Sequence, residues 1–257
     1  MFTWILIFSP VLGAVFGSFI NAAVFRLYKG MSIVHGRSGC TRCSYQLQWY
    51  DLIPIGSFIR LRGMCRQCQK PIPLDYVLVE LIMAVLFLFA TWLWHENTNS
   101  VLWLIRDLSA ISILVFLFVY DFKYYLIPDS VSLPAIALFF LINVILGIPW
   151  YNLLGAMAIG FGFFAWQYVV SKGKWIGGGD LRFGALMGAL LGWPVIFVGL
   201  FLAYIIGSII AIGLLISGKK QLGNKVPFAT FLSVATLISL WYGQPLLNRY
   251  LQLTGII

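Results

Sequence analysis

Apolar blocks of roughly twenty residues recur along this chain and constrain its fold more than any other feature. A helix needs about 20 mostly apolar residues to cross a bilayer. Eight segments are candidate spans: 2–25, 76–95, 101–120, 129–147, 151–170, 181–193, 194–216 and 227–246. Hydrophobic residues make up 61 % of the chain and charged residues 10 %, whereas soluble domains are about one quarter charged. The sequence therefore predicts an all-α polytopic membrane protein with about eight transmembrane helices.

Three regions follow from this pattern. We expect a first transmembrane helix over 1–25, a cytoplasmic loop over 26–75 and a transmembrane core over 76–257. The first span lacks the basic start and the small-residue cleavage site of a signal peptide, so we expect it to be retained.

Basic residues predict the orientation in the membrane. If the N-terminus is outside, segments 26–75, 121–128, 171–180 and 217–226 face the cytoplasm. They hold most of the 17 Lys and Arg residues: Arg26, Lys29, Arg37, Arg42, Arg60, Arg62, Arg66, Lys70, Lys123, Lys172, Lys174, Lys219, Lys220 and Lys225. Such an excess is typical of cytoplasmic loops. The net charge of +9 then indicates contact with anionic membrane lipid rather than with nucleic acid.

One predicted span is short. Residues 181–193 would form a helix of about 20 Å at 1.5 Å per residue, whereas the hydrocarbon core is about 30 Å thick. Gly184, Gly188 and Gly192 recur every four residues, a spacing that lets a helix lie close against its neighbour. We therefore expect a short helix that is surrounded by protein.

The predicted cytoplasmic loop contains all four cysteines. They form two C-x-x-C pairs: Cys40 with Cys43, and Cys65 with Cys68. This spacing is typical of a four-thiolate zinc site. Disulfides or unrelated thiols are the alternative, and a reducing cytosol disfavours disulfides. The prediction is a structural zinc site, because a closed four-cysteine site leaves no open position for catalysis.

Several hydrolytic mechanisms are excluded by what the sequence lacks. The predicted topology places His35 and His95 on opposite membrane faces, so neither is expected to serve a serine nucleophile on the other face. The G-x-S-x-G and H-E-x-x-H motifs are absent. No dinucleotide-binding βαβ unit surrounds the glycine run at 177–179. Carboxylates remain as candidates for chemistry.

Three of the eight acidic residues lie at predicted cytoplasmic helix ends, namely Asp121, Asp129 and Asp180. Acids at such depths are costly and are often functional. Asp129 follows Pro128 and begins a predicted helix, which favours an N-cap role. Asp121 ends a predicted helix, where the helix dipole disfavours a negative charge. Elsewhere, Asp107 follows Arg106 and is expected to pair with it.

Three glycines precede Asp180. It could cap the helix over 181–193, but Gly177, Gly178 and Gly179 are more than a cap requires. We predict that they leave the backbone open to a substrate peptide, which could pair with it as an added strand.

Two aspartates held close together would form a hydrolytic pair. They share a proton, because both cannot ionise at short range. The ionised member can activate water while the protonated member donates to the carbonyl. The residues alone leave two interpretations open. Asp121 and Asp180 form such a pair, or they are two unrelated acids at helix ends.

Several motifs in order resemble the type IV prepilin peptidases. They are GSFINAAVFRL at 17–27, CTRC at 40–43, QWYDLIPIGSFIRLRGMCRQC at 48–68, VELIMAVLF at 79–87, YDFKYYLIPD at 120–129 and GGGDLRFGALMGALLG at 177–192. The last is similar to a G-x-G-D motif shared with presenilin-like proteases. Thr41 and Tyr28 stand where the family commonly has proline, and neither position carries the proposed chemistry.

The resemblance implies a bifunctional leader peptidase and N-methyltransferase of a bacterial inner membrane. Asp121 and Asp180 would be catalytic, and they and the zinc loop would lie on the cytoplasmic side. The substrate would be a prepilin or pseudopilin with a short basic leader, a glycine before the cut and a hydrophobic helix after it. S-adenosylmethionine would be the methyl donor. Its binding residues are unknown, and the cytoplasmic loop is the expected region. The oligomeric state stays open.

Other functions predict different patterns. A zinc-loop membrane transporter or sensor without protease activity would place acids near the middle of several spans, where this chain has few. A methyltransferase without proteolysis would leave the GGGD stretch unexplained. A catalytically silent scaffold for pilus assembly is a third alternative.

Overall fold

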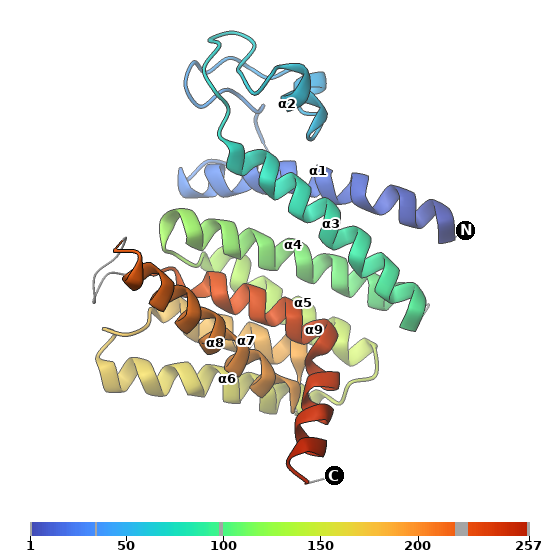
Figure 1. Cartoon of the computed structure of the whole chain (residues 1–257), viewed down its shortest axis with the longest axis vertical. Coiled ribbons are helices and arrows are strands. Elements are labelled where there is room, and N and C mark those ends of the chain that lie inside the picture. Colours follow the sequence, from blue (N-terminus) through green and yellow to red (C-terminus); the bar gives the residue numbers. More distant parts are fainter. Residues whose placement is uncertain (1, 34, 98–99, 219–225, 256–257) are drawn as a thin grey trace. The chain divides into compact units, whose positions relative to one another are not determined.

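The computed structural model describes residues 2–33, 35–97, 100–218 and 226–255. It comprises two compact units, Met1–Phe116 and Leu117–Ile257. The described elements are α1 (Phe2–Tyr28), η1 (Trp49–Asp51), α2 (Gly56–Arg60), α3 (Leu74–Asn97), α4 (Val101–Tyr124), α5 (Asp129–Ile145), α6 (Trp150–Ser171), α7 (Gly178–Leu191), α8 (Val195–Ile216) and α9 (Phe228–Leu253) (Figure 1).

The predicted all-helical, multi-pass membrane protein is confirmed. In the part of the chain that the structure describes, α1, α3, α4, α6, α8 and α9 are long and apolar enough to cross a membrane. Helix α5 has 17 residues and α7 has 14, so the expected total of eight crossings stays a prediction. Three of the basic residues used for orientation, Lys219, Lys220 and Lys225, lie outside the described residues.

The first unit is built on the close packing of α1 against α3. Two glycines of α1 face the α3 backbone. A Cβ atom at Gly17 would lie 2.7 Å from the Cα atom of Glu80, and one at Gly13 would overlap Met83. Larger side chains at either position would push the two helices apart. The cysteine loop joins this pair of helices at one end.

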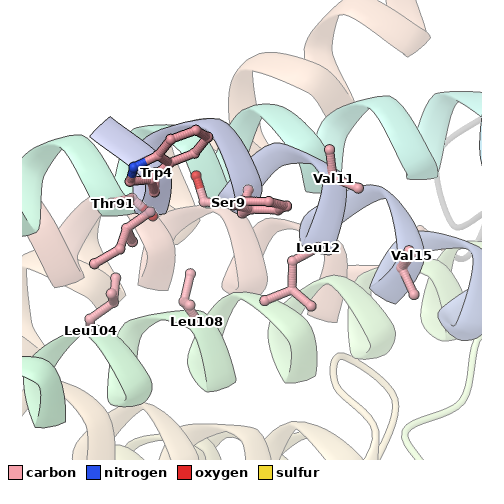
Figure 2. A pocket seen from close by; sticks show the side chains of 10 residues that line it. Trp4, Ser9, Val11, Leu12, Val15, Thr91, Leu104 and Leu108 are labelled. Carbon is pink, nitrogen blue, oxygen red and sulfur yellow. The ribbon is translucent and has the colours of Figure 1, made fainter. Parts of the chain in front are cut away.

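An apolar groove of about 500 Å³ lies in the first unit (Figure 2). Its walls are Trp4, Ile5, Phe8, Ser9, Val11, Leu12, Val15, Thr91, Leu104 and Leu108. The Ser9 hydroxyl donates to the Leu6 carbonyl at 3.2 Å, and the Thr91 hydroxyl donates to Phe87 at 2.8 Å. The groove therefore presents hydrocarbon to its surroundings and has no titratable side chain in its lining.

Helix α7 lies at the centre of the second unit, in contact with α5, α6, α8 and α9 (Figure 1). Its glycines allow this packing. A Cβ atom at Gly184 would lie 2.6 Å from the Phe164 ring and would also overlap the backbone of Gly160 on α6. Gly188 faces α6 in the same way, whereas Gly192 ends the helix with φ at +65°. The expected short helix surrounded by protein is confirmed.

Two asparagines satisfy the backbone where α7 ends inside the protein. The side-chain N–H of Asn143 on α5 donates to the carbonyls of Ala189 at 2.7 Å and Leu190 at 3.3 Å. Asn152 on α6 accepts from the Trp193 N–H at 2.8 Å and donates to the Trp193 carbonyl at 3.0 Å. Backbone groups that leave a helix need such partners where water is scarce, so these hydrogen bonds allow α7 to end after 14 residues.

Candidate active site and metal centre

The position of Asp121 is explained by a helix other than its own. It lies in the last turn of α4, where the carbonyl end of the dipole disfavours an anion. Its side chain meets the first turn of α9 instead, and the Thr230 N–H donates to Asp121 Oδ2 at 3.2 Å. The Ala229 N–H also donates to this carboxyl. A helix N-terminus favours negative charge through its free N–H groups.

Asp180 is also held at a helix N-terminus. It is the third residue of α7, and its Oδ2 accepts a hydrogen bond from the N–H of the N-cap residue Gly177 at 2.9 Å. The expectation that Asp180 could be the cap of a helix over 181–193 is wrong, because the helix begins at Gly178 and Gly177 is its N-cap. As the third helical residue, Asp180 instead accepts from the N–H of that N-cap residue.

The two carboxyl groups lie in the same buried region of the second unit. Asp121 is 5 % exposed and Asp180 is 7 % exposed, and their side chains interact electrostatically. Two acids close to each other in a dry environment favour a single shared negative charge. The structure therefore brings the predicted pair together, and their catalytic role stays a prediction.

The glycine run has a different conformation from the one expected. Gly177 is extended, with φ at −83° and ψ at 158°, but Gly178 and Gly179 already belong to α7. The expected open strand over all three glycines is therefore wrong, because the helix begins within the run. Gly179 serves close packing, since a Cβ atom there would lie 2.9 Å from the Cβ of Ile127. Substrate binding by the three glycines stays a prediction.

The N-cap role expected for Asp129 is wrong. Pro128 occupies the N-cap position of α5, and Asp129 is the first helical residue. Its carboxylate forms an ion pair with Arg182 in the first turn of α7. The physical reason is that a neighbouring guanidinium competes successfully for a carboxylate that is 52 % exposed. The expected pair of Arg106 and Asp107 is confirmed at 2.6 Å.

The four cysteines of the loop form one cluster. Their sulfur atoms all lie within 4.8 Å of one another, with Cys40 and Cys68 at 3.9 Å and Cys43 and Cys65 also at 3.9 Å. A tetrahedral zinc with Zn–S bonds of about 2.3 Å places its sulfurs about 3.8 Å apart. The donor set and its spacing thus fit one tetrahedral metal ion.

Both cysteine pairs lie on turns of the same design. The N–H of Cys40 donates to the Tyr45 carbonyl, and the N–H of Cys65 donates to Lys70, each at 2.9 Å. Each turn is also closed by an isolated β-bridge, Gly39 with Gln46 and Met64 with Pro71. The paired turns present two sulfurs each toward a common centre.

The thiols of one turn differ in their ionisation. Burial opposes ionisation of Cys40, yet the N–H groups of Arg42 and Cys43 lower its pKa to about 7. The Tyr45 N–H lowers the pKa of Cys43, but desolvation and the neighbouring thiols of Cys40 and Cys68 raise it overall to about 11. A bound divalent cation would remove this mutual opposition, because coordination deprotonates a thiol.

Side-chain contacts fix the loop to itself and to α3. Arg66 donates to Asp51 Oδ1 at 2.6 Å, and this hydrogen bond raises the pKa of the Arg66 guanidinium. Glu80 on α3 is buried and accepts from the Ile55 N–H at 2.8 Å. Ile55 has φ at +59°, which is unusual for a β-branched residue, so the Glu80 contact holds a strained turn.

Sequence reasoning missed the residues of α8 and α9 that interact with the aspartates. Thr230 is 109 residues away from Asp121 along the chain. Tyr204 on α8 interacts electrostatically with Asp180 and donates to Gln167 Oε1 at 2.7 Å. A polar pair within two apolar spans was the available signal, because such residues are rare there.

Comparison with known proteins gives one consistent relationship. The family model described as Bacterial Peptidase A24 N-terminal domain matches residues 11–94, and the model described as Type IV leader peptidase family matches 108–212. A Bacillus subtilis (strain 168) protein named prepilin leader peptidase/N-methyltransferase is 30 % identical over 95 % of this chain and 96 % of the relative.

Two further relatives have the same name. The Pseudomonas putida protein is 26 % identical over 96 % of this chain and 94 % of its own length. The Myxococcus xanthus protein is 35 % identical over 82 % of this chain and 63 % of its own length. No solved structure matches this chain.

Proposed function

Because this chain belongs to the type IV leader peptidase family, we propose that it removes the leader from prepilins or pseudopilins as a membrane aspartic endopeptidase. The observation that carries this proposal is the pair of buried, interacting carboxyl groups of Asp121 and Asp180. The alternative of a membrane transporter or sensor gains no support, because all three relatives described above are named prepilin leader peptidase/N-methyltransferase.

The geometry supports acid–base hydrolysis by the aspartates. The ionised member takes a proton from water, and the resulting hydroxyl adds to the carbonyl carbon of the scissile peptide. The protonated member donates to the carbonyl oxygen, and a proton finally reaches the leaving amine as the C–N bond breaks. Backbone N–H groups orient Asp121 from α9 and Asp180 from Gly177, so little reorganisation is needed during the reaction.

We propose zinc as the metal of the loop, held by Cys40, Cys43, Cys65 and Cys68. The support is the four-thiolate donor set and its sulfur spacing. Its role would be structural, because the short helices and turns of this loop have too little core to be stable without a metal.

We propose that the chain also methylates the new N-terminal amine, as the names of the relatives suggest. S-adenosylmethionine would supply the methyl group when bound. The loop is the proposed region for it. The Trp49 side chain there is 76 % exposed, and such a ring can stack on an adenine or attract a sulfonium cation.

The proposed location is the bacterial inner membrane, with the loop and both aspartates on the cytoplasmic side. The excess of Lys and Arg in the loop supports this orientation. A substrate with an apolar helix in the bilayer would then present its leader on the side where the aspartates lie. Membrane lipid is the other expected partner.

Mass spectrometry of reaction products tests both activities. The purified protein is incubated with a full-length prepilin, with and without S-adenosylmethionine. We expect loss of the leader in both reactions and the added mass of one methyl group only with the donor. An intact prepilin after prolonged incubation would contradict the peptidase proposal. A shortened product that never gains the methyl mass would contradict only the methyltransferase proposal.

A further inference from the structure

A hydroxyl and a carboxamide face each other in the second unit. Tyr204 lies on α8 and Gln167 on α6, and the Tyr204 hydroxyl donates to Gln167 Oε1 at 2.7 Å. Both side chains are partly accessible, and both helices are candidate membrane spans. Polar groups in spanning helices are costly and are generally retained for function.

Aromatic rings connect this polar pair to the aspartates. The Tyr204 ring contacts Phe163 at 5.7 Å and Phe228 at 5.3 Å, both edge to face. Phe228 is the first residue of α9, the helix whose Thr230 N–H holds Asp121. Phe228 also packs on Phe164 and Phe231, which are buried in the core. The accessible rings are those of Phe163 and Phe228, and together with Tyr204 they form an aromatic wall beside the start of α9.

The polar pair retains hydrogen-bonding capacity. The Gln167 side-chain nitrogen donates one proton to the Phe163 carbonyl at 3.3 Å, and an amide nitrogen has two protons. The Tyr204 hydroxyl donates its hydrogen bond to Gln167, so the lone pairs of its oxygen remain available as acceptors. Within the described residues, one donor and one acceptor are therefore left without a protein partner.

One donor and one acceptor complement a peptide group, which offers one C=O and one N–H. The helix of a membrane-embedded substrate must unwind at the cleavage site before a water molecule can reach the scissile carbonyl. Its backbone groups then lose their helical partners, which is costly where water is scarce. The Tyr204 hydroxyl also interacts electrostatically with Asp180, and its ring contacts Phe228 at the start of the helix that holds Asp121.

We propose that Tyr204 and Gln167 bind the backbone of the substrate peptide beside the scissile bond, while the aromatic wall contacts the apolar side chains next to it. This inference rests on the proposed peptidase function. Tyr204 and Gln167 are substrate-binding residues here, and Asp121 and Asp180 perform the chemistry.

Steady-state kinetics with purified prepilin tests the contact. Tyr204→Phe removes the hydroxyl and keeps the ring, and Gln167→Met removes the amide and keeps the length of the side chain. We expect KM to rise about three- to tenfold in each variant, as for the loss of a neutral hydrogen bond. The kcat should stay within about twofold, because the contact exists before and during the reaction. The double variant should show less than the product of the two effects, because each group orients the other.

Tyr151→Phe is the matched control, since Tyr151 lies at the opposite end of α6 and is 65 % exposed. It should keep the KM of the unmodified protein. An unchanged KM in both Tyr204→Phe and Gln167→Met would overturn the inference, and the hydrogen bond would then only join α6 to α8. A fall in kcat at unchanged KM would overturn it as well.

A binding measurement separates this inference from the peptidase proposal. Fluorescent prepilin is titrated against the Asp121→Asn protein with and without Tyr204→Phe. A Kd that is three- to tenfold higher when Tyr204→Phe is present supports the contact, whichever acids perform the chemistry. An equal Kd in the two proteins contradicts it. Failure of the unmodified protein to cleave prepilin contradicts the peptidase proposal alone.

Discussion

Each candidate catalytic aspartate is placed where backbone N–H groups offset the cost of a buried carboxyl. Asp121 belongs to α4 but accepts from the first turn of α9, and Asp180 accepts from the N-cap of its own helix. Burial makes a carboxylate costly, whereas a helix N-terminus stabilises it. Small shifts of either helix terminus should therefore affect the pair, which makes the neighbouring glycines a sensitive place for substitution.

We expect Gly178→Ala and Gly179→Ala to differ sharply. A Cβ atom at Gly178 meets open space, whereas one at Gly179 would lie 2.9 Å from the Cβ of Ile127. Gly178→Ala should be neutral or stabilise α7 by up to about 1 kcal/mol. Gly179→Ala should cost about 1–3 kcal/mol and reduce leader removal, because Asp180 follows directly. Unfolding temperatures and cleavage rates of the two proteins test this difference. Equal values in both proteins would contradict the close packing of Gly179 against Ile127.

The ion pair of Asp129 with Arg182 should matter little. Its partners are 52 % and 38 % exposed, and such pairs contribute about 0–1 kcal/mol. Asp129→Asn should therefore keep appreciable cleavage activity and nearly the original unfolding temperature. Complete loss of cleavage in a folded protein would mean that Asp129 takes part in the chemistry.

At the level of elements, α7 determines the organisation of the second unit. It is short, buried and enclosed by four helices, and its close approach to α6 depends on glycines on both sides. Its final carbonyls are satisfied by Asn143. Because Asp180 lies in its first turn, the packing of α7 against α6 also sets the position of one catalytic candidate.

Gly184→Leu should disrupt this packing. The new side chain would overlap Gly160 on α6, and the overpacking should cost about 3 kcal/mol or more. Gly162→Leu is the matched control, because a Cβ atom at that position on α6 meets nothing within 4 Å. Unfolding temperatures in the same detergent measure the difference. A Gly184→Leu protein as stable as the control would show that α6 and α7 do not pack as described.

The helices were largely predictable, and their ends were not. The apolar blocks indicate where α1, α3, α4, α6, α8 and α9 lie, because length and hydropathy are local properties of the sequence. The start of α7 at Gly178 was not predicted, since consecutive glycines have a low helix propensity. The Asp180 contact with Gly177 stabilises that first turn, and packing against Ile127 favours the absence of a side chain at Gly179.

At the level of the whole molecule, the candidate metal site and the candidate catalytic pair lie in two different units. The cysteine cluster belongs to Met1–Phe116, and Asp121 and Asp180 belong to Leu117–Ile257. The sequence predicted both groups of residues, because C-x-x-C spacing and acids at helix ends are local signals. It could not predict that Thr230 binds Asp121, that Tyr204 interacts with Asp180 or that Gln167 binds Tyr204. Those contacts depend on how distant helices pack.

Metal removal should affect the loop first. We expect about one zinc per chain by elemental analysis, as for one four-cysteine site, and none in Cys65→Ser Cys68→Ser protein. Without metal, limited proteolysis should cut the 26–75 region faster, because its turns depend on the shared ion. The helices of the second unit should keep their protection. Freshly reduced protein that contains no metal would contradict the zinc proposal.

The cleavage of purified prepilin by Asp121→Asn and Asp180→Asn proteins tests the central claim most directly. Both variants should unfold at temperatures close to that of the unmodified protein. Each should lose leader removal by about a thousandfold or more, as when one member of a catalytic unit is removed. Appreciable cleavage by either folded variant would contradict the assignment of these two carboxyl groups as one catalytic pair.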